Sequence, residues 1–131
     1  MNETDRQFLF DLRKTLLHLH KTLLDWERAA YERVHGRVSA GELLKVIVED
    51  SQFAWLRPIS ELIVRIDETV DAEAPVNAAD IDALAGRARV VTAPDEAGTP
   101  QARRYHAALQ EHPDAVFAHR AVTNVLKARA L

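Results

Sequence analysis

The 131-residue chain contains no cysteine. Disulfides, cysteine-based zinc sites and thiol catalysis are therefore excluded, and nothing in the sequence points to an oxidising compartment. Glycine and proline together occupy only nine positions, and the sequence holds no Gly-x-Ser-x-Gly, Walker or Gly-x-Gly-x-x-Gly segment. The sequence gives no support to nucleophilic hydrolysis or to nucleotide chemistry, and we expect a protein that is not an enzyme.

Long apolar runs are also missing. No segment approaches the roughly 20 apolar residues that cross a bilayer, and the opening "MNETDRQFLFDLRK" lacks the basic and apolar regions of a secretory leader. We therefore expect a cytoplasmic protein with no membrane partner. A formal net charge of −3 provides no electrostatic drive toward nucleic acid. The short basic clusters "GRAR", "QARRYH" and "HRAVTNVLKARAL" are interpreted as solvated helix surfaces rather than as a nucleic-acid interface.

The composition is that of a single globular domain spanning residues 1–131, with 47% hydrophobic and 28% charged residues. Apolar residues recur with helical spacing from end to end, while no segment shows the period-two alternation of a strand. We predict an all-α fold, a compact bundle of about five to six helices with one long N-terminal helix.

Capping residues and prolines predict where these helices begin and end. The long helix runs from Glu3 to Val34 and ends at Gly36, a residue that tolerates positive φ. Ser39 opens a second helix that ends near Asp50, which can cap a third over residues 51–70. Pro58 should kink or briefly break this third helix. Three further starts are predicted at Asn77, at Thr99 with Pro100, and at Pro113.

Two neighbouring apolar rows run along the long helix, making a face wide enough for two partner helices. We expect it to pack between the third helix and the C-terminal pair. The first row comprises Phe8, Leu12, Leu16, Leu19, Leu23, Trp26, Ala30 and Val34, and the second comprises Phe10, Leu17, Leu24 and Tyr31.

Arg13, His20 and Glu27, spaced by seven, form a polar row between the two apolar rows. An unpaired polar group where helices pack costs on the order of 1–3 kcal/mol, so each should find a partner. Tyr31 is within reach of Glu27 along the helix. The partners that other helices offer beside their apolar stripes are Asp67, His112, His119, Arg120 and Asn124.

Two interpretations of the polar row stay open. The favoured one is a buried hydrogen-bond or ion-pair network, with no cofactor. The alternative is a ligand site formed by Arg13, His20, Glu27, Tyr31 and His119, or a metal ion held by His20, Glu27, His112 and His119. Metal signatures argue against the alternative, because Glu-x-x-His occurs only at Glu32 and His35 and no His-x-x-x-His occurs.

The segment "FAWLRPISELIVRIDE", residues 53–68, preceded by "KTLLDWERAAYERVHGRVSAGELL" and followed later by "ARRY", resembles a group of uncharacterised bacterial proteins of similar length. The resemblance covers most of the chain and implies no activity, cofactor or partner. Within this segment, Phe53, Trp55 and Arg57 form a candidate binding surface, because Trp and Arg are common in binding hot spots. The alternative, which we favour, is that Trp55 belongs to the core and Arg57 forms a salt bridge with a neighbour.

Taken together, these features predict a non-enzymatic interaction or regulatory module, a homo-oligomer that uses the faces of the long helix and the third helix. The partner is then a second copy or another protein. The alternative function is a metal- or small-ligand-binding bundle of sensor or redox type, centred on His20 and Glu27.

Overall fold

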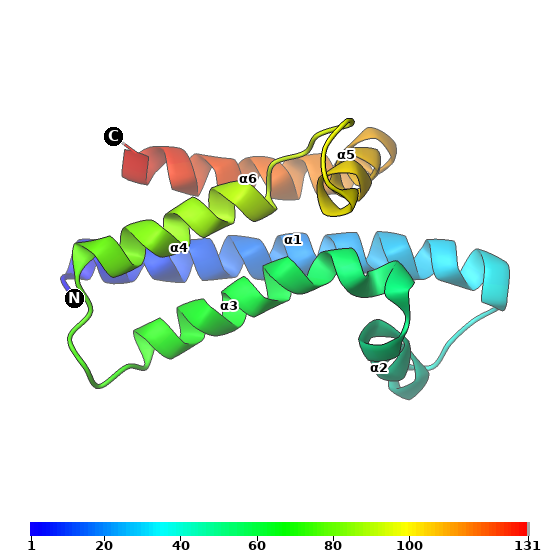
Figure 1. Ribbon diagram of the computed structural model, residues 1–131, viewed down its shortest axis with the longest axis horizontal. Coiled ribbons are helices and arrows are strands. Elements are labelled where there is room, and N and C mark those ends of the chain that lie inside the picture. Colours follow the sequence, from blue (N-terminus) through cyan, green and yellow to red (C-terminus); the bar gives the residue numbers. More distant parts are fainter. Residues whose placement is uncertain (131) are drawn as a thin grey trace.

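The computed structural model describes residues 1–130 and places them in an all-helical fold, with no strand among these residues (Figure 1). The prediction of an all-α bundle with one long N-terminal helix is confirmed. In chain order the elements are α1 (Glu3–His35), α2 (Ala40–Glu49), the 3₁₀ helix η1 (Ser51–Leu56), α3 (Arg57–Val70), α4 (Ala78–Val91), α5 (Pro100–Glu111) and α6 (Pro113–Ala130).

The helix starts follow the capping residues that the sequence offers. The side chains of Ser39, Asp50, Asn77 and Thr99 each accept a hydrogen bond from a backbone N–H in the first turn that follows. Asn2 caps α1 in the same way, although it was not predicted to do so. Capping is local, so these boundaries follow from a few neighbouring residues.

Pro58 lies at the start of α3, directly after η1. The 3₁₀ helix ends at Leu56, and α3 begins at Arg57 with Pro58 in its first turn. The missing N–H of proline costs little there, because the first N–H groups of a helix have no partner within the helix. The predicted break in the third helix is confirmed.

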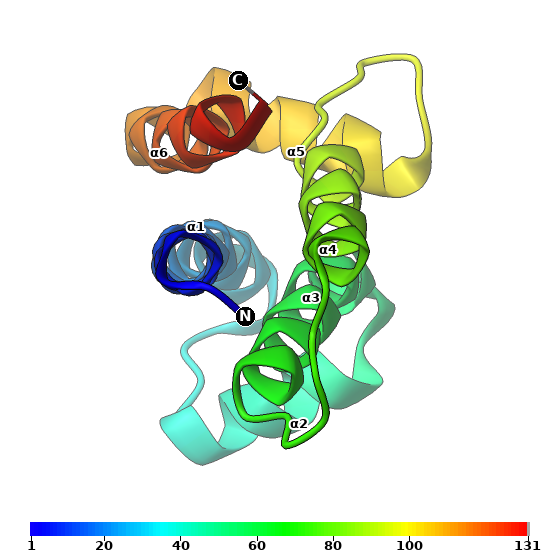
Figure 2. The ribbon, with the colours of Figure 1, turned by 90° about the vertical axis from the view of Figure 1, so that its left-hand side faces the viewer.

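Four helices run along the long axis of the molecule, and α2 and α5 run across it at one end (Figure 1). Viewed along α1, α6 lies on one side of this helix and α3 on the other, with α4 between them (Figure 2). The long helix therefore packs between α3 and α6, and of the predicted C-terminal pair it is α6 that makes the main contact with α1.

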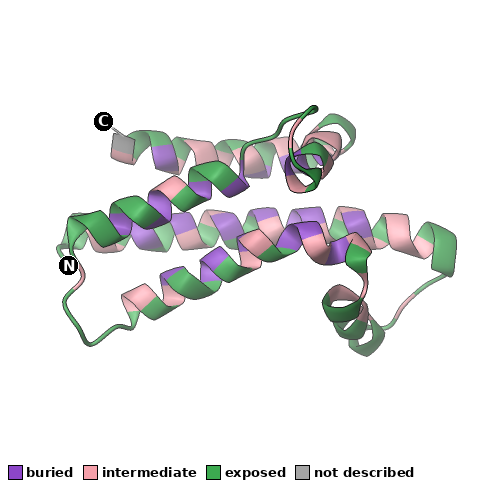
Figure 3. Cartoon of the chain, in the orientation of Figure 1, coloured by how far each residue is buried: buried purple, intermediate pink, exposed green. Residues whose placement is uncertain are grey.

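The core is built around one side of α1 (Figure 3). The first apolar row is buried from Phe8 to Leu23, together with Leu9. The second row was expected to be covered as well, but Phe10 and Leu17 are exposed. The wide-face prediction holds for the first row from Phe8 to Leu23 but is wrong for Val34 at its end, which is 78% exposed. It is also wrong for the N-terminal half of the second row, because α3 and α6 cover only part of the circumference of α1.

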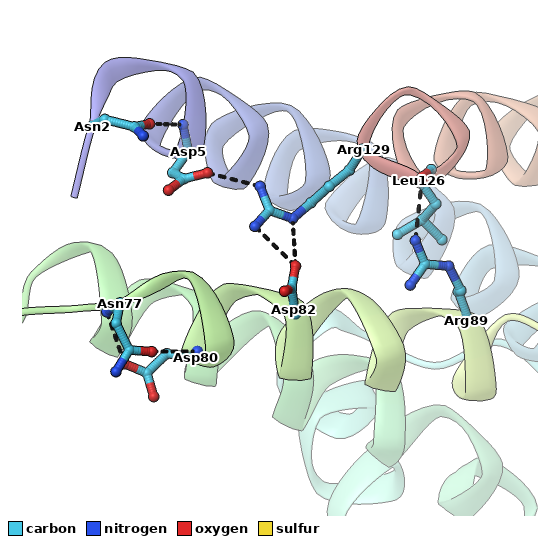
Figure 4. Close-up of polar contacts among 8 residues, drawn as sticks. All are labelled: Asn2, Asp5, Asn77, Asp80, Asp82, Arg89, Leu126 and Arg129. Carbon is cyan, nitrogen blue, oxygen red and sulfur yellow. Dashed lines mark hydrogen bonds and ion pairs between the residues drawn. The ribbon is translucent and has the colours of Figure 1, made fainter. Parts of the chain in front are cut away.

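Arg129 ties together the end of the molecule where α1 begins and α6 ends (Figure 4). Its guanidinium lies 2.8 Å from a carboxylate oxygen of Asp5 on α1 and 2.9 Å from one of Asp82 on α4. The hydrogen bond to Asp5 is the main cause that raises the pKa of Arg129. The guanidinium carbon also lies 5.0 Å from the centre of the Phe8 ring. One side chain thereby joins three helices.

Candidate functional site

Glu27 is the one buried carboxylate among the described residues, with 1% of its surface exposed. Its Oε1 accepts hydrogen bonds from Trp55 Nε1 at 2.8 Å and from Arg104 Nε at 3.0 Å. Its Oε2 accepts from Arg104 Nη2 at 2.6 Å and from Gln52 Nε2 at 3.3 Å. Through these bonds one carboxylate on α1 is joined to η1 and to α5.

Trp26 completes this group of side chains. The guanidinium carbon of Arg104 lies 4.2 Å from the centre of the Trp26 ring, and the Trp26 and Trp55 rings meet edge to face at 6.2 Å. The hydrogen bonding of Arg104 to the Glu27 carboxylate, in which Arg104 donates, is the main cause that raises the pKa of Arg104. We call these five residues, Trp26, Glu27, Gln52, Trp55 and Arg104, the Glu27 cluster.

The geometry of the Glu27 cluster restricts its chemistry. An ionised carboxylate offers about four lone-pair positions to donors. The four hydrogen bonds described above occupy that capacity, so Glu27 has no position left for a metal ion or for a proton taken from a substrate. Glu27 thus belongs to a hydrogen-bond network in which each of its carboxylate oxygens accepts two hydrogen bonds from the protein.

The other members of the polar row have separate partners. Arg13 forms an ion pair with Asp67 on α3, one of the partners that the sequence offered. His20 is half-buried, and burial lowers its pKa. Tyr31, expected to reach Glu27, instead stacks on His35 with ring centres 4.1 Å apart. The residues of the polar row follow one another along α1, but they do not share partners and do not form a single site.

The two histidines proposed to complete a ligand set lie elsewhere. His119 on α6 has its Nδ1 2.7 Å from the hydroxyl of Tyr105 on α5. His112 follows the last residue of α5 as its C-cap. It lines a depression of about 390 Å³ together with His18, Asp25 and Asp114. No three His, Asp or Glu side chains among residues 1–130 are grouped closely enough to hold a metal ion. The structure does not bring His20, Glu27, His112 and His119 together.

The candidate surface around Trp55 is corrected by the structure. Phe53 and Trp55 are both buried. The indole N–H of Trp55 can be buried because it donates to Glu27 inside the bundle. Arg57 is exposed and donates to the backbone carbonyl of Val48 at 2.7 Å. The alternative that Trp55 belongs to the core is therefore correct, while the partner of Arg57 is a carbonyl rather than the expected salt-bridge carboxylate.

Sequence reasoning missed Arg104 and Gln52 as partners of Glu27. Arg104 belongs to "QARRYH", which was interpreted as a solvated helix surface. A signal was nevertheless present, since Arg104 lies four residues before Ala108, a small residue on the buried side of α5. A long cationic side chain beside a buried alanine can reach a carboxylate in the core.

A second feature of interest is α2, which contains five aliphatic residues in ten positions and buries none of its residues (Figure 3). Leu44 and Val48, four residues apart on one side of the helix, are each 69% exposed. Leu43, Val46 and Ile47 are only partly covered. We call the side that carries Leu44 and Val48 the α2 surface.

Comparison with known proteins yields no match: neither a family model, nor a curated protein, nor a solved structure matches this chain. No helix among the described residues has both the length and the apolar composition to span a bilayer.

Proposed function

We propose that this protein is a non-enzymatic interaction module that pairs with a second copy of itself through the α2 surface. The observation that carries the proposal is that α2 leaves Leu44 and Val48 each 69% exposed, while its Val46 and Ile47 pack partly against the core. Neighbouring exposed apolar residues are typical of protein interaction sites. The proposal keeps the homo-oligomer predicted from the sequence but moves the interface from α1 and α3 to α2.

Burial energetics support an intermolecular role for α2. Complete burial of a Leu or Val side chain stabilises a protein by about 1.5–3 kcal/mol. The folded chain forgoes most of this free energy at Leu44 and Val48, whereas α3 and α4 bury an aliphatic residue on each turn. A partner helix laid along the α2 surface would recover it.

The charges beside the α2 surface favour a second copy as the partner. Lys45 and Glu49 flank Leu44 and Val48 on one side of the helix. A symmetric dimer interface must be complementary to itself. When two α2 helices pack antiparallel, Lys45 of each copy can lie opposite Glu49 of the other, so the symmetry produces two ion pairs. As part of the same proposal, the module acts in the cytoplasm, a reducing compartment with which a sequence without cysteine is compatible.

The test is sedimentation equilibrium of the full chain over a wide range of concentration. We expect a reversible dimer, and we expect the double variant Leu44→Ser, Val48→Ser to raise the dissociation constant at least about tenfold, because a few buried apolar residues carry most of the free energy of an interface. Helix content measured by circular dichroism should be unchanged, since both side chains are exposed in the monomer.

A matched control removes the same kind of side chain from other helices. Val64 on α3 and Val90 on α4 are 54% and 61% exposed. The variant Val64→Ser, Val90→Ser should dimerise like the parent. A parent that stays monomeric at the highest concentration, or equal dissociation of the two variants, contradicts the proposal.

A further inference from the structure

A depression of about 300 Å³ lies between the C-terminal half of α4 and the middle of α6. Its polar lining includes Arg89, His119 and Lys127, and no carboxylate lines it among the described residues. The chain as a whole has 20 acidic residues against 17 Lys and Arg. A concave site with only basic charges is therefore not what the average composition would give.

Neither cation of this depression has an acidic partner among residues 1–130. Arg89 donates one Nη2 hydrogen to the backbone carbonyl of Leu126 at 3.4 Å, a long contact that holds the guanidinium against α6 (Figure 4). Neither Arg89 nor Lys127 forms an ion pair with any residue in 1–130, unlike Arg104 and Arg129. Both positive charges remain available to a ligand.

His119 also lines the depression. Its Nδ1 lies 2.7 Å from the hydroxyl of Tyr105, and burial raises the pKa of Tyr105, which keeps the phenol protonated. Burial also lowers the pKa of His119, so its imidazole is neutral at pH 7. A neutral phenol donates better than it accepts, so Nδ1 accepts and the imidazole proton resides on Nε2. Nε2–H is then the hydrogen that the His119 ring retains for a ligand.

Two features of the depression disfavour the binding of an anion. The C-terminal end of α4 carries a partial negative charge of about half an elementary charge, which two full positive charges outweigh. The hydroxyls of Thr92 and Thr123 donate to the backbone carbonyls of Ala88 and His119. They have no hydrogen left for a ligand, so recognition depends on the nitrogen donors.

We propose that this depression binds a small oxyanion, a phosphate monoester or a carboxylate, through Arg89, Lys127 and His119. A guanidinium matches the geometry of two oxygens of one phosphate or carboxylate group, and an ammonium adds a compact second charge. The volume is at the lower end of small-molecule sites, which fits one acidic group with a short organic part rather than a nucleotide. The wall formed by Ala93, Pro94 and Leu126 would contact that organic part.

The test is a titration of the ¹⁵N-labelled full chain with inorganic phosphate and, separately, with acetate, with chloride keeping the ionic strength constant. We expect saturable amide shifts concentrated in residues 89–94 and 119–127 with at least one of the two anions. Arg89→Gln and Lys127→Gln should each weaken this binding about tenfold or more, since each removes a charge-assisted hydrogen bond.

Matched controls separate a site from general charge screening. Arg33→Gln and Lys14→Gln remove the same charges from exposed positions of α1 and should leave the binding of both anions unchanged. Shifts that stay linear with both anions, shifts spread over the whole basic surface, or equal weakening by site and control variants would overturn the proposal.

Discussion

At the scale of single residues, the cost of burying Glu27 is offset by the donors that surround it. A carboxylate loses several kcal/mol when it leaves water, and this loss is recovered only when its lone pairs are satisfied with good geometry. The bidentate contact with Arg104 and the bonds from Trp55 and Gln52 meet that condition. The Glu27 cluster therefore fixes how α1, η1 and α5 sit relative to one another.

Removing the charge of Glu27 should be costly. Glu27→Gln keeps the shape of the side chain but places an NH₂ group against donors. Removal of one partner from a buried ion pair typically costs 3–5 kcal/mol, and because 38% of the Arg104 side chain is exposed and can turn to water, we expect about 2–3 kcal/mol. Urea unfolding measures this change in the free energy of unfolding.

The control for that experiment is Asp25→Asn, which breaks the exposed ion pair between Asp25 and Lys21 at 2.9 Å on the same helix. A surface pair contributes little, so a loss of no more than about 0.5 kcal/mol is expected. Similar losses in the two variants would show that the burial of Glu27 has no energetic consequence.

At the scale of elements, the link between α1 and α2 depends on Gly36. Its backbone has φ 84° and ψ 172°, a combination that is almost confined to glycine, and a Cβ added there would meet no atom within 4 Å. Gly36→Ala should therefore destabilise the protein by about 1–3 kcal/mol through backbone strain alone. Thermal unfolding monitored by circular dichroism provides the measurement.

Gly41 supplies the matched comparison, because it lies inside α2 and an added Cβ there also meets nothing within 4 Å. Gly41→Ala should stabilise the protein by up to about 1 kcal/mol, since alanine favours the helix. If both substitutions shift stability in the same direction, the strain at Gly36 is refuted.

The helices of this protein were largely predictable, whereas the partners of the polar row were not, apart from Asp67 for Arg13. Caps such as Asn77 and breaks such as Pro58 act within a few residues, so the sequence carries their signal directly. Arg104 lies 77 residues from Glu27, and no local pattern links them. The exposure of Phe10 likewise depends on which sides of α1 its neighbours cover, which periodicity along one helix does not contain.

At the scale of the whole molecule, stability should depend on pH through His20 and His119. Burial lowers the pKa of both residues below the ordinary value of about 6.5, so the unfolded chain binds these protons more tightly than the folded chain. Their contribution is complete above about pH 6.5 and is lost as the pH falls through the lower folded values. The free energy of unfolding should therefore decrease from about pH 7 to about pH 5.

Urea unfolding at a series of pH values tests this dependence. His20→Gln keeps a polar side chain of similar length and removes one of the two titrating groups, so its stability should fall less steeply than that of the parent over the same interval. A variant with the full slope of the parent would exclude His20 as a contributor.

The Arg129 contact with Asp5 also determines how the protein can be attached to something else. It holds the start of α1 beside the end of α6, while α2 follows the far end of a 33-residue helix, about 50 Å away at the normal rise of an α-helix. A tag, a bead or a further domain joined at either end of residues 1–130 therefore emerges on the side opposite to α2. A tethered chain would present α2 outermost, ready to meet a second molecule in solution or on a facing surface.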